Sequence, residues 1–259
     1  MDLIKSDILQ ALILTKDEDP NIGRVLERLK RLEKVIVLDS FSTDDTPEIA
    51  RSFPNVELHQ RIFDTHAAQW NYGLSLASSK WVLSLDADYI LDDDFIGEIR
   101  EKLAAANKSA HFTHFKFLVF GKELTSDNTT PRPVLFIKSN CNYFDDGHTQ
   151  RLEVAGATGF FKSCILHDDR KSLSRWLSNQ DKYSVKECDK LLNADPDKLS
   201  FISKIRKTKI FAPIFVFLYC LFAKRLILCG WHGWHYTLQR TIVEMLLTLR
   251  LIEKTKLGE

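Results

Sequence analysis

The sequence predicts an α/β protein built on a mostly parallel sheet, and three observations lead to this fold class. Short apolar runs rich in β-branched residues alternate with segments of helical spacing over residues 8–91. Such alternation is typical of parallel strands joined by right-handed helical crossovers. Polar residues follow the apolar runs, at the strand ends where open α/β sheets bind ligands. A chain of 259 residues, 44% hydrophobic and 27% charged, can bury a substantial core.

The elements of this sheet follow from local patterns. Short aliphatic runs predict strands at 8–14, 34–38, 56–59 and 82–85. Apolar spacing and the cap signal Thr46-Pro47 predict helices at 22–32, 47–53 and 66–78. Residues 111–138 alternate apolar and polar side chains, which predicts antiparallel strands, and a further helix is expected at 172–193. Asp92, Asp93 and Asp94 open another helix, where we expect them to cap its N-terminus rather than bind a ligand.

Two carboxylates, Asp86 and Asp88, follow the fourth strand one residue apart. Side chains at positions i and i+2 of a strand point the same way, so both carboxylates can converge on one point. Like charges that close are costly unless a cation lies between them. Mg²⁺ and Mn²⁺ take oxygen ligands and also accept phosphate oxygens. We therefore expect a site for a metal and a diphosphate, although Asp is also frequent in solvated turns.

Polar residues also end the first two strands. Thr15 and Glu18 follow the first strand, and Asp39 ends the second. Three such positions on one edge of a sheet predict a nucleotide pocket. The first strand is not followed by Gly-x-Gly-x-x-Gly, and the chain has no Gly-Lys-Ser/Thr, so a Rossmann dinucleotide site and a P-loop are not expected.

Three blocks of the sequence resemble inverting glycosyltransferase family 2, in this order and spacing: Ala11–Glu18 (ALILTKDE), Val35–Thr46 (VIVLDSFSTDDT) and Leu83–Asp88 (LSLDAD). The resemblance covers residues 8–100 strongly and 130–250 more loosely. Within the family, the chain most resembles the lipopolysaccharide-core and capsule glycosyltransferases. It implies a GT-A fold, a nucleotide-sugar donor with UDP favoured, and Mg²⁺ or Mn²⁺ as cofactor. Phe41 stands where the family more usually has Gly.

The resemblance also implies roles for individual residues. Thr15 and Glu18 would line the nucleotide pocket, and Asp39 would contact the base. Asp86 would lie on the ribose side, and Asp88 would bind the metal, with Asp86 beside it.

Three further positions are candidates for donor or metal contacts. Gln69 and Asn71, on the expected helix at 66–78, would touch the nucleotide sugar; the alternative is a solvated helix face. His167 ends a short apolar run and resembles a late metal or phosphate ligand of the fold, whereas a lone His is more often structural.

An inverting transfer needs a base that takes the proton of the acceptor hydroxyl. The segment 142–150 offers Asp145, Asp146 and His148, and the sequence does not choose among them. A turn at Asp145-Asp146-Gly147 is the alternative interpretation.

The chain changes character near residue 200. Residues 201–259 hold ten Lys or Arg and three Asp or Glu, a net charge of +7, whereas residues 1–200 hold 26 and 32, a net charge of −6. The apolar run at 210–223 contains Pro213 and is shorter than the roughly 20 residues that span a bilayer. We expect a GT-A catalytic domain at 1–200 and a helical, membrane-associating tail at 201–259 that binds an anionic membrane surface.

The alternative for this tail is a buried helical pair packed on the catalytic domain. Within the tail, we expect a tight turn at Gly230–Tyr236 and a closing helix at 237–252.

These observations predict an enzyme that moves a sugar from a nucleotide-diphosphate donor to a lipid-linked glycan, with no nucleic-acid partner. The alternatives are a polyprenol-phosphate sugar transferase and a non-catalytic membrane adaptor that retains the fold. The five cysteines show no Cys-x-x-Cys spacing, which fits a reducing compartment. Because the first seven residues lack a secretory pattern, we expect a cytoplasmic protein, peripheral on the inner face of the cell membrane.

Overall fold

The computed structural model of the chain describes residues 3–125, 130–146, 149–195, 197 and 199–257. The chain divides into two compact units. One, the sheet unit, contains Met1–Leu118 and Asp127–Arg170; the other, the helical unit, contains Val119–Ser126 and Lys171–Glu259.

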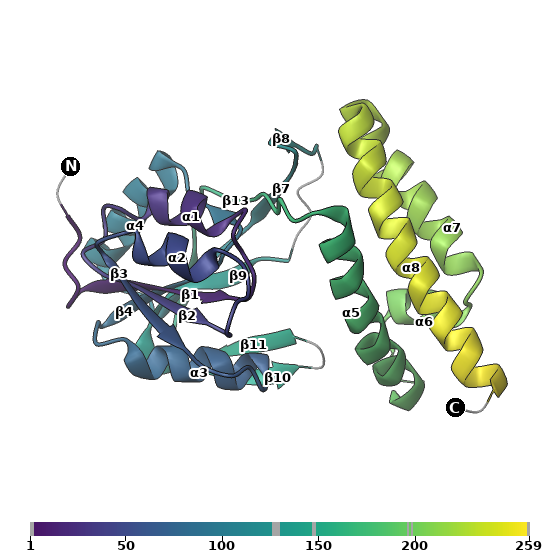
Figure 1. The fold of residues 1–259 in the computed structure, drawn as a ribbon, viewed down its shortest axis with the longest axis horizontal. Coiled ribbons are helices and arrows are strands. Elements are labelled where there is room, and N and C mark those ends of the chain that lie inside the picture. The colour runs from purple at the N-terminus through teal and green to yellow at the C-terminus, as the bar shows by residue number, and fades with distance from the viewer. Residues whose placement is uncertain (1–2, 126–129, 147–148, 196, 198, 258–259) are drawn as a thin grey trace. The chain divides into compact units, whose positions relative to one another are not determined.

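A seven-stranded sheet forms the centre of the sheet unit (Figure 1). Its strands, in spatial order, are β12 (Thr158–Phe160), β6 (Ala110–Thr113), β9 (Arg132–Ile137), β4 (Trp81–Asp86), β1 (Leu9–Thr15), β2 (Val35–Asp39) and β3 (Val56–Gln60). β4, β1, β2 and β3 pair in parallel, and β9 runs antiparallel to both β4 and β6. The mostly parallel α/β fold expected from the sequence is confirmed.

The other strands form two smaller sheets. One has the order β5 (Tyr89–Ile90), β13 (Ile165–His167), β7 (Phe115–Val119) and β8 (Lys122–Glu123). In the other, β10 (Cys141–Asp146), which follows the 3₁₀ turn η1 (Lys138–Asn140), pairs antiparallel with β11 (Thr149–Val154). The antiparallel pairing expected over 111–138 holds for β6 and β9, whereas β7 pairs in parallel with β13. Alternating side chains indicate a strand, but they do not specify its partner.

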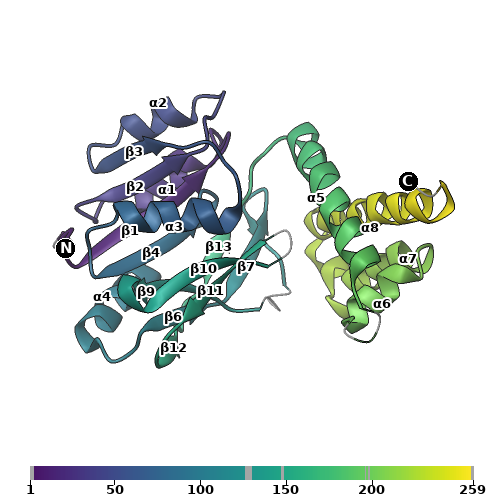
Figure 2. The ribbon, with the colours of Figure 1, turned by 90° about the horizontal axis from the view of Figure 1, so that it is seen from below.

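Helices cover both faces of the main sheet (Figures 1 and 2). α1 (Ile22–Arg28), α2 (Thr46–Arg51) and α4 (Asp93–Ala105) pack on one face, and α3 (His66–Leu76) packs on the other. Neighbouring residues of β1 point to opposite faces, so Ile13 joins the core under α1 while Leu12 joins the core under α3. Each such buried side chain stabilises the fold by about 1.5–3 kcal/mol relative to an exposed one.

Helix caps account for where these helices begin and end. The Asp92 carboxylate accepts a hydrogen bond from Phe95 N at 2.7 Å, which confirms the predicted capping role. α1 ends at Arg28, although its apolar spacing predicts a helix to 32. Leu29 and Leu32 stay buried in a turn beyond the helix, so the core contacts continue after the helical backbone has ended.

The helical unit is built from two long helices and several short ones. Its elements are α5 (Leu173–Asn193), α6 (Phe201–Lys207), α7 (Phe211–Leu218), the π-helical turn η3 (Tyr219–Ala223), the 3₁₀ turn η4 (Leu226–Cys229) and α8 (Trp231–Leu257). Cys188 and Leu191 of α5 pack against Leu247 and Leu251 of α8. This packing is why the units divide at Arg170/Lys171 and not at the expected 200/201.

A partly buried ion-pair cluster also holds the helical unit together. The Arg206 guanidinium donates to both carboxylate oxygens of Glu244, which is 2% exposed, and to Glu187 at 2.9 Å. These contacts connect α6 to α8 and α5. Among the described residues, no helix has both the length and the apolar character needed to cross a bilayer.

The tight turn expected at Gly230–Tyr236 is wrong, because α8 already begins at Trp231. Gly230 has a φ of 61° and leads from η4 directly into the helix. A Cβ on Gly233 would lie 1.9 Å from the carbonyl oxygen of Leu226. The second glycine therefore permits a close approach of η4 to the helix rather than a turn.

Candidate active site

The carboxyl ends of β4, β1 and β2 bring three of the expected site residues to one edge of the sheet. Thr15 of β1 is the register partner of Asp39 in β2, and Leu14 is the partner of Asp86 in β4. This edge of the parallel sheet is where ligands of open α/β folds bind. The sheet thus places Thr15, Asp39 and Asp86 on neighbouring strands, as the sequence predicts.

Asp39 is fully buried and holds the start of the β2–α2 loop. Its Oδ1 accepts a hydrogen bond from Thr15 Oγ1 at 3.0 Å and another from the Ser42 hydroxyl. Its Oδ2 accepts from Ser42 N at 2.9 Å and from Gln60 Nε2 at 3.1 Å. The carboxylate therefore joins β1, β2 and β3 and fixes the loop that follows it.

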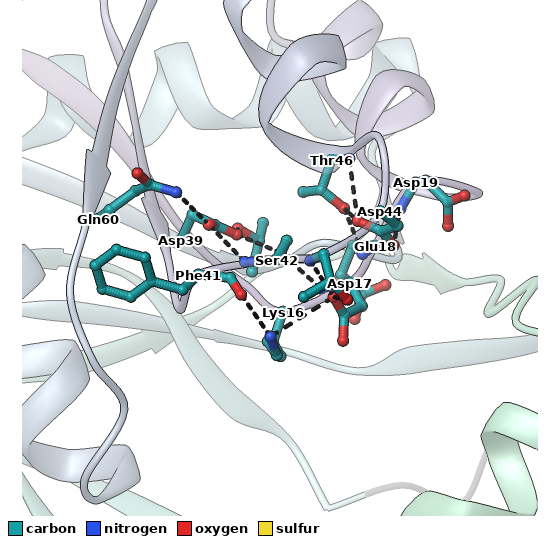
Figure 3. Close-up of polar contacts among 12 residues, drawn as sticks. Lys16, Asp17, Glu18, Asp19, Asp39, Phe41, Ser42, Asp44, Thr46 and Gln60 are labelled. Carbon is teal, nitrogen blue, oxygen red and sulfur yellow. Dashed lines mark hydrogen bonds and ion pairs between the residues drawn. The ribbon is translucent and has the colours of Figure 1, made fainter.

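The loops after β1 and β2 bind each other along their whole length (Figure 3). Asp17 N donates to Ser42 Oγ at 2.7 Å, and Glu18 N donates to Thr46 Oγ1 at 2.6 Å. In the reverse direction, Thr43 N donates to Asp17 Oδ1 at 2.7 Å. Side-chain oxygens thus satisfy backbone amides across the two loops and connect them at the edge where Thr15 and Asp39 lie.

The acid pair lies at the end of β4. Burial and then the neighbouring Asp88 raise the pKa of Asp86, whose carboxylate also receives a hydrogen bond from Tyr89. Asp88 is 8% exposed, and its Oδ2 lies 3.1 Å from His167 Nε2. Burial lowers the pKa of His167, but the nearby carboxylates of Asp88, Asp86 and Asp169 together more than offset this, so the pKa is raised. β13 therefore brings His167 to the acid pair from a distant part of the chain.

Comparison with known proteins identifies the chain. The family model for glycosyl transferase family 2 matches residues 11–167, more than half of the sequence. The chain belongs to glycosyltransferase family 2. The residues that the match covers include both loops, the acid pair and His167.

Individual relatives of the family 2 chain agree with this assignment. It is 22% identical over 256 residues to a lipopolysaccharide core biosynthesis glycosyltransferase, LpsC, from Rhizobium meliloti, covering 95% of this chain and 92% of that protein. An uncharacterized glycosyltransferase of Rickettsia conorii is 31% identical over 107 residues, 41% of this chain. That match spans little more than a third, 38%, of the Rickettsia protein.

A solved structure shares the fold. S. aureus TarS, crystallised in complex with UDP-GlcNAc, aligns over 97% of this chain and 92% of its own with a TM-score of 0.51 and 13% sequence identity. At that identity the likeness concerns the fold alone.

Asp88 and His167 are the pair in this family 2 chain best placed to hold a divalent metal. Among the described residues, no group of three or more His, Cys, Asp or Glu side chains lies close enough together to hold a metal ion. A carboxylate and an imidazole nevertheless fit an ion that completes its coordination with the oxygens of a diphosphate. Asp88, His167 and Asp86 as metal ligands all stay predictions.

A second set of contacts, not foreseen from the sequence, ties the end of β13 to α1. Asp168 is 1% exposed, and its carboxylate binds the guanidinium groups of Arg24 and Arg170. Arg170 N donates to Asn21 Oδ1 at 3.1 Å. Asn21 Nδ2 in turn donates to Glu18 Oε2 at 3.0 Å. We call these contacts the Asp168 clamp; they connect the His167 strand to the Glu18 loop.

Gln69 and Asn71 bind protein groups in this structure. Gln69 is fully buried, and its amide donates to Ser40 Oγ at 3.1 Å. Asn71 makes a two-way pair with the backbone of Tyr143: its Nδ2 donates to the carbonyl at 2.8 Å, and its Oδ1 accepts from the amide at 3.0 Å. A nucleotide contact by either side chain would require a change of partner, and that role stays a prediction.

One of the three candidate bases can be placed. Asp145 lies on β10, and its Oδ1 accepts a hydrogen bond from Ala67 N at 3.1 Å, in the first turn of α3. Two residues earlier on β10, the Tyr143 hydroxyl binds Ser84 on β4, the strand that the acid pair follows. The side chain of Asp146 and the whole of His148 lie outside the described residues.

Proposed function

We propose that this chain is an inverting glycosyltransferase that moves a sugar from a nucleotide-diphosphate donor, UDP favoured, to a lipid-linked glycan of the lipopolysaccharide-core type. The observation that carries the proposal is the convergence of Thr15, Asp39 and Asp86 at one sheet edge, with Asp88 paired to His167. TarS, which shares the fold, holds UDP-GlcNAc, so the fold accommodates such a donor. The name of LpsC supplies the acceptor class, since the two chains align over nearly their full length.

In this proposal, some residues bind the donor nucleotide and others hold the metal or act on the acceptor. Thr15, Asp39 and Glu18 form the nucleotide side, and Asp88 with His167 would hold Mg²⁺ or Mn²⁺. When bound, the ion supplies positive charge that stabilises the departing diphosphate.

The acceptor oxygen bonds to the anomeric carbon from the face opposite the diphosphate. The bond from that carbon to the diphosphate oxygen breaks, and the diphosphate keeps the electron pair. Asp145 takes the proton of the acceptor hydroxyl in this proposal, with Asp146 and His148 as alternatives.

Donor binding with and without metal tests this site. We expect Asp88→Asn to abolish the effect of Mn²⁺ on UDP affinity in calorimetry while the melting temperature of the apoprotein stays close to that of the wild type. Asp93→Asn is the matched control, because Asp93 is an exposed carboxylate that opens α4. An Mn²⁺ effect of equal size in Asp88→Asn and wild type would contradict the metal assignment. Metal-dependent hydrolysis of a donor sugar would separate an enzyme from a non-catalytic adaptor.

For the acceptor we infer a membrane surface as the second partner. Large apolar side chains of α7 and η3 are exposed within the helical unit, among them Phe211 (69%), Ile214 (55%) and Phe222 (60%). Cationic residues such as Lys204 and Arg225 lie on either side of this stretch. Exposed aromatic and aliphatic side chains next to Lys and Arg suit the interface of an anionic bilayer, on its cytoplasmic face in this proposal.

Vesicle flotation tests the membrane proposal. We expect the full chain to float with vesicles containing anionic lipid, and binding to weaken at high salt. Phe211→Glu combined with Phe222→Glu should abolish it, whereas Phe160→Glu, at an exposed site of the sheet unit, should not. If the full chain does not bind vesicles at any salt concentration, the result would contradict the membrane proposal and favour the alternative, a helical pair packed within the protein.

A further inference from the structure

Phe41 adopts a backbone conformation that its side chain disfavours. Its φ is 58°, in the left-handed region where glycine is the usual residue and a bulky side chain is an outlier. The side chain is also 48% exposed. A large apolar residue thus occupies a strained position at the edge of the site, and its side chain is only partly buried there.

Neighbouring contacts hold the strained conformation on three sides. Ser40 N donates to Thr15 O at 2.8 Å, and Ser42 N donates to Asp39 Oδ2 at 2.9 Å. The carbonyl of Phe41 itself accepts a hydrogen bond from Lys16 Nζ at 2.6 Å. A strained residue that its surroundings fix so closely is typical of ligand-binding sites.

The ring extends away from the acidic residues of the β1–α1 loop, past Asp39 (Figure 3). The start of the β3–α3 loop lies on this side, because Gln69 Nε2 donates both to Ser40 Oγ at 3.1 Å and to Arg61 O at 3.4 Å. Ile62, which follows Arg61, is 77% exposed. An exposed apolar side chain therefore follows the carboxyl end of β2 and another follows that of β3.

We propose that Phe41 is a stacking platform for the nucleobase of the donor. A nucleoside diphosphate has one planar, weakly solvated part, and an exposed aromatic ring beside a polar, metal-binding edge matches it. Glycine would satisfy the backbone of this loop without strain, but it would offer no ring. The inference rests on the proposed function, since it needs a nucleotide donor, and it adds a binding residue that neither motif nor strand end predicts.

Paired ligands separate base stacking from phosphate binding. Calorimetry with Mn²⁺ would compare inorganic pyrophosphate with whichever of UDP, CDP, GDP and ADP the wild type binds most tightly. Loss of a base–aromatic stack weakens binding by about 5-fold to about 150-fold. We expect Phe41→Gly to lose nucleotide affinity within this range while pyrophosphate affinity stays unchanged. Phe41→Tyr, which keeps the ring, should bind the nucleotide within about twofold of wild type.

Two controls make the result decisive. The melting temperature of Phe41→Gly should stay close to that of the wild type, because relief of backbone strain offsets the loss of partial burial. Phe160→Ala removes another exposed aromatic of the sheet unit and should leave nucleotide affinity unchanged. Equal nucleotide affinity in Phe41→Gly and wild type, or an equal loss for pyrophosphate, would overturn the stacking role alone. Absence of nucleotide binding in the wild type would overturn this inference and the proposed function together.

Discussion

Replacement of His111 by leucine should make the stability of the sheet unit less sensitive to acid. His111 lies on β6 and is 5% exposed, and its ring centroid lies 6.0 Å from that of Trp81 and 5.9 Å from that of Phe161. Within the described part of the chain, neither of its ring nitrogens has a hydrogen-bond partner. Burial, and then the nearby charge of Lys102, lower the pKa of His111 from 6.5 to about 4, against the opposing charge of Glu98.

The sign follows from proton binding. Between pH 6.5 and pH 4 the unfolded chain binds a proton at His111 that the native chain does not, so stability falls as the pH falls through this window. With pKa values of 6.5 unfolded and about 4 native, acidification from pH 7.5 to 5 lowers the free energy of unfolding by about 2 kcal/mol through this one group. His111→Leu keeps a similar volume and has no proton to bind, so this contribution disappears.

Urea unfolding at pH 7.5 and pH 5 measures the effect. The wild type should lose about 2 kcal/mol more than His111→Leu between the two pH values, and other titrating groups cancel in the comparison. His114→Gln is the matched control, because His114 is an exposed histidine of the same unit. The same pH response in wild type and His111→Leu would refute the reasoning.

Three further substitutions test other parts of the chain. Asp39→Asn removes the negative charge and replaces one of the two accepting oxygens by an amide donor, so the four hydrogen bonds that the carboxylate accepts cannot all be kept, and we expect UDP affinity to fall about tenfold or more by calorimetry, with or without metal. Asp145→Asn retains an acceptor for Ala67 N but no base, so turnover should fall far more than donor affinity; unchanged turnover would point to Asp146 or His148. Arg206→Met leaves the buried Glu244 carboxylate and the partly buried Glu187 without their cation, and thermal unfolding followed by circular dichroism should show a loss of about 3–5 kcal/mol. Partial recovery on adding Glu244→Gln would identify the unpaired charge as the cause.

The sequence predicts those features of the fold that depend on neighbours along the chain. The aliphatic runs of β1, β2 and β4 mark the strands, and alternation with helices implies that the strands are parallel. Once they are parallel, Thr15, Asp39 and Asp86 must share an edge. The cap at Asp92 is equally local, since donor and acceptor lie three residues apart.

Features that depend on distant partners could not be predicted in this way. Arg24 and Asp168 are 144 residues apart, and no pattern in either segment predicts that the two residues are in contact. Asn71 is on an expected polar helix face, but its partner, the backbone of Tyr143, belongs to a strand 72 residues later. Glycine is common in turns, so Gly233 suggests a turn when the sequence is considered alone. Only the nearby carbonyl oxygen of Leu226 shows that this glycine lets η4 pack closely against α8.

The Asp168 clamp has a consequence for how the protein is made. The loop that carries Glu18 leaves the ribosome well before residues 168–170, and the contacts of Arg24 with Asp168 and of Asn21 with Arg170 form only once those later residues have emerged. Because domains assemble as the chain is synthesised, the donor side of a nascent chain stays incomplete until the whole sheet unit is available. A fragment that stops before β13 would retain the first three strands and both loops, but it would lack His167 and the Asp168 contacts that connect this strand to the Glu18 loop.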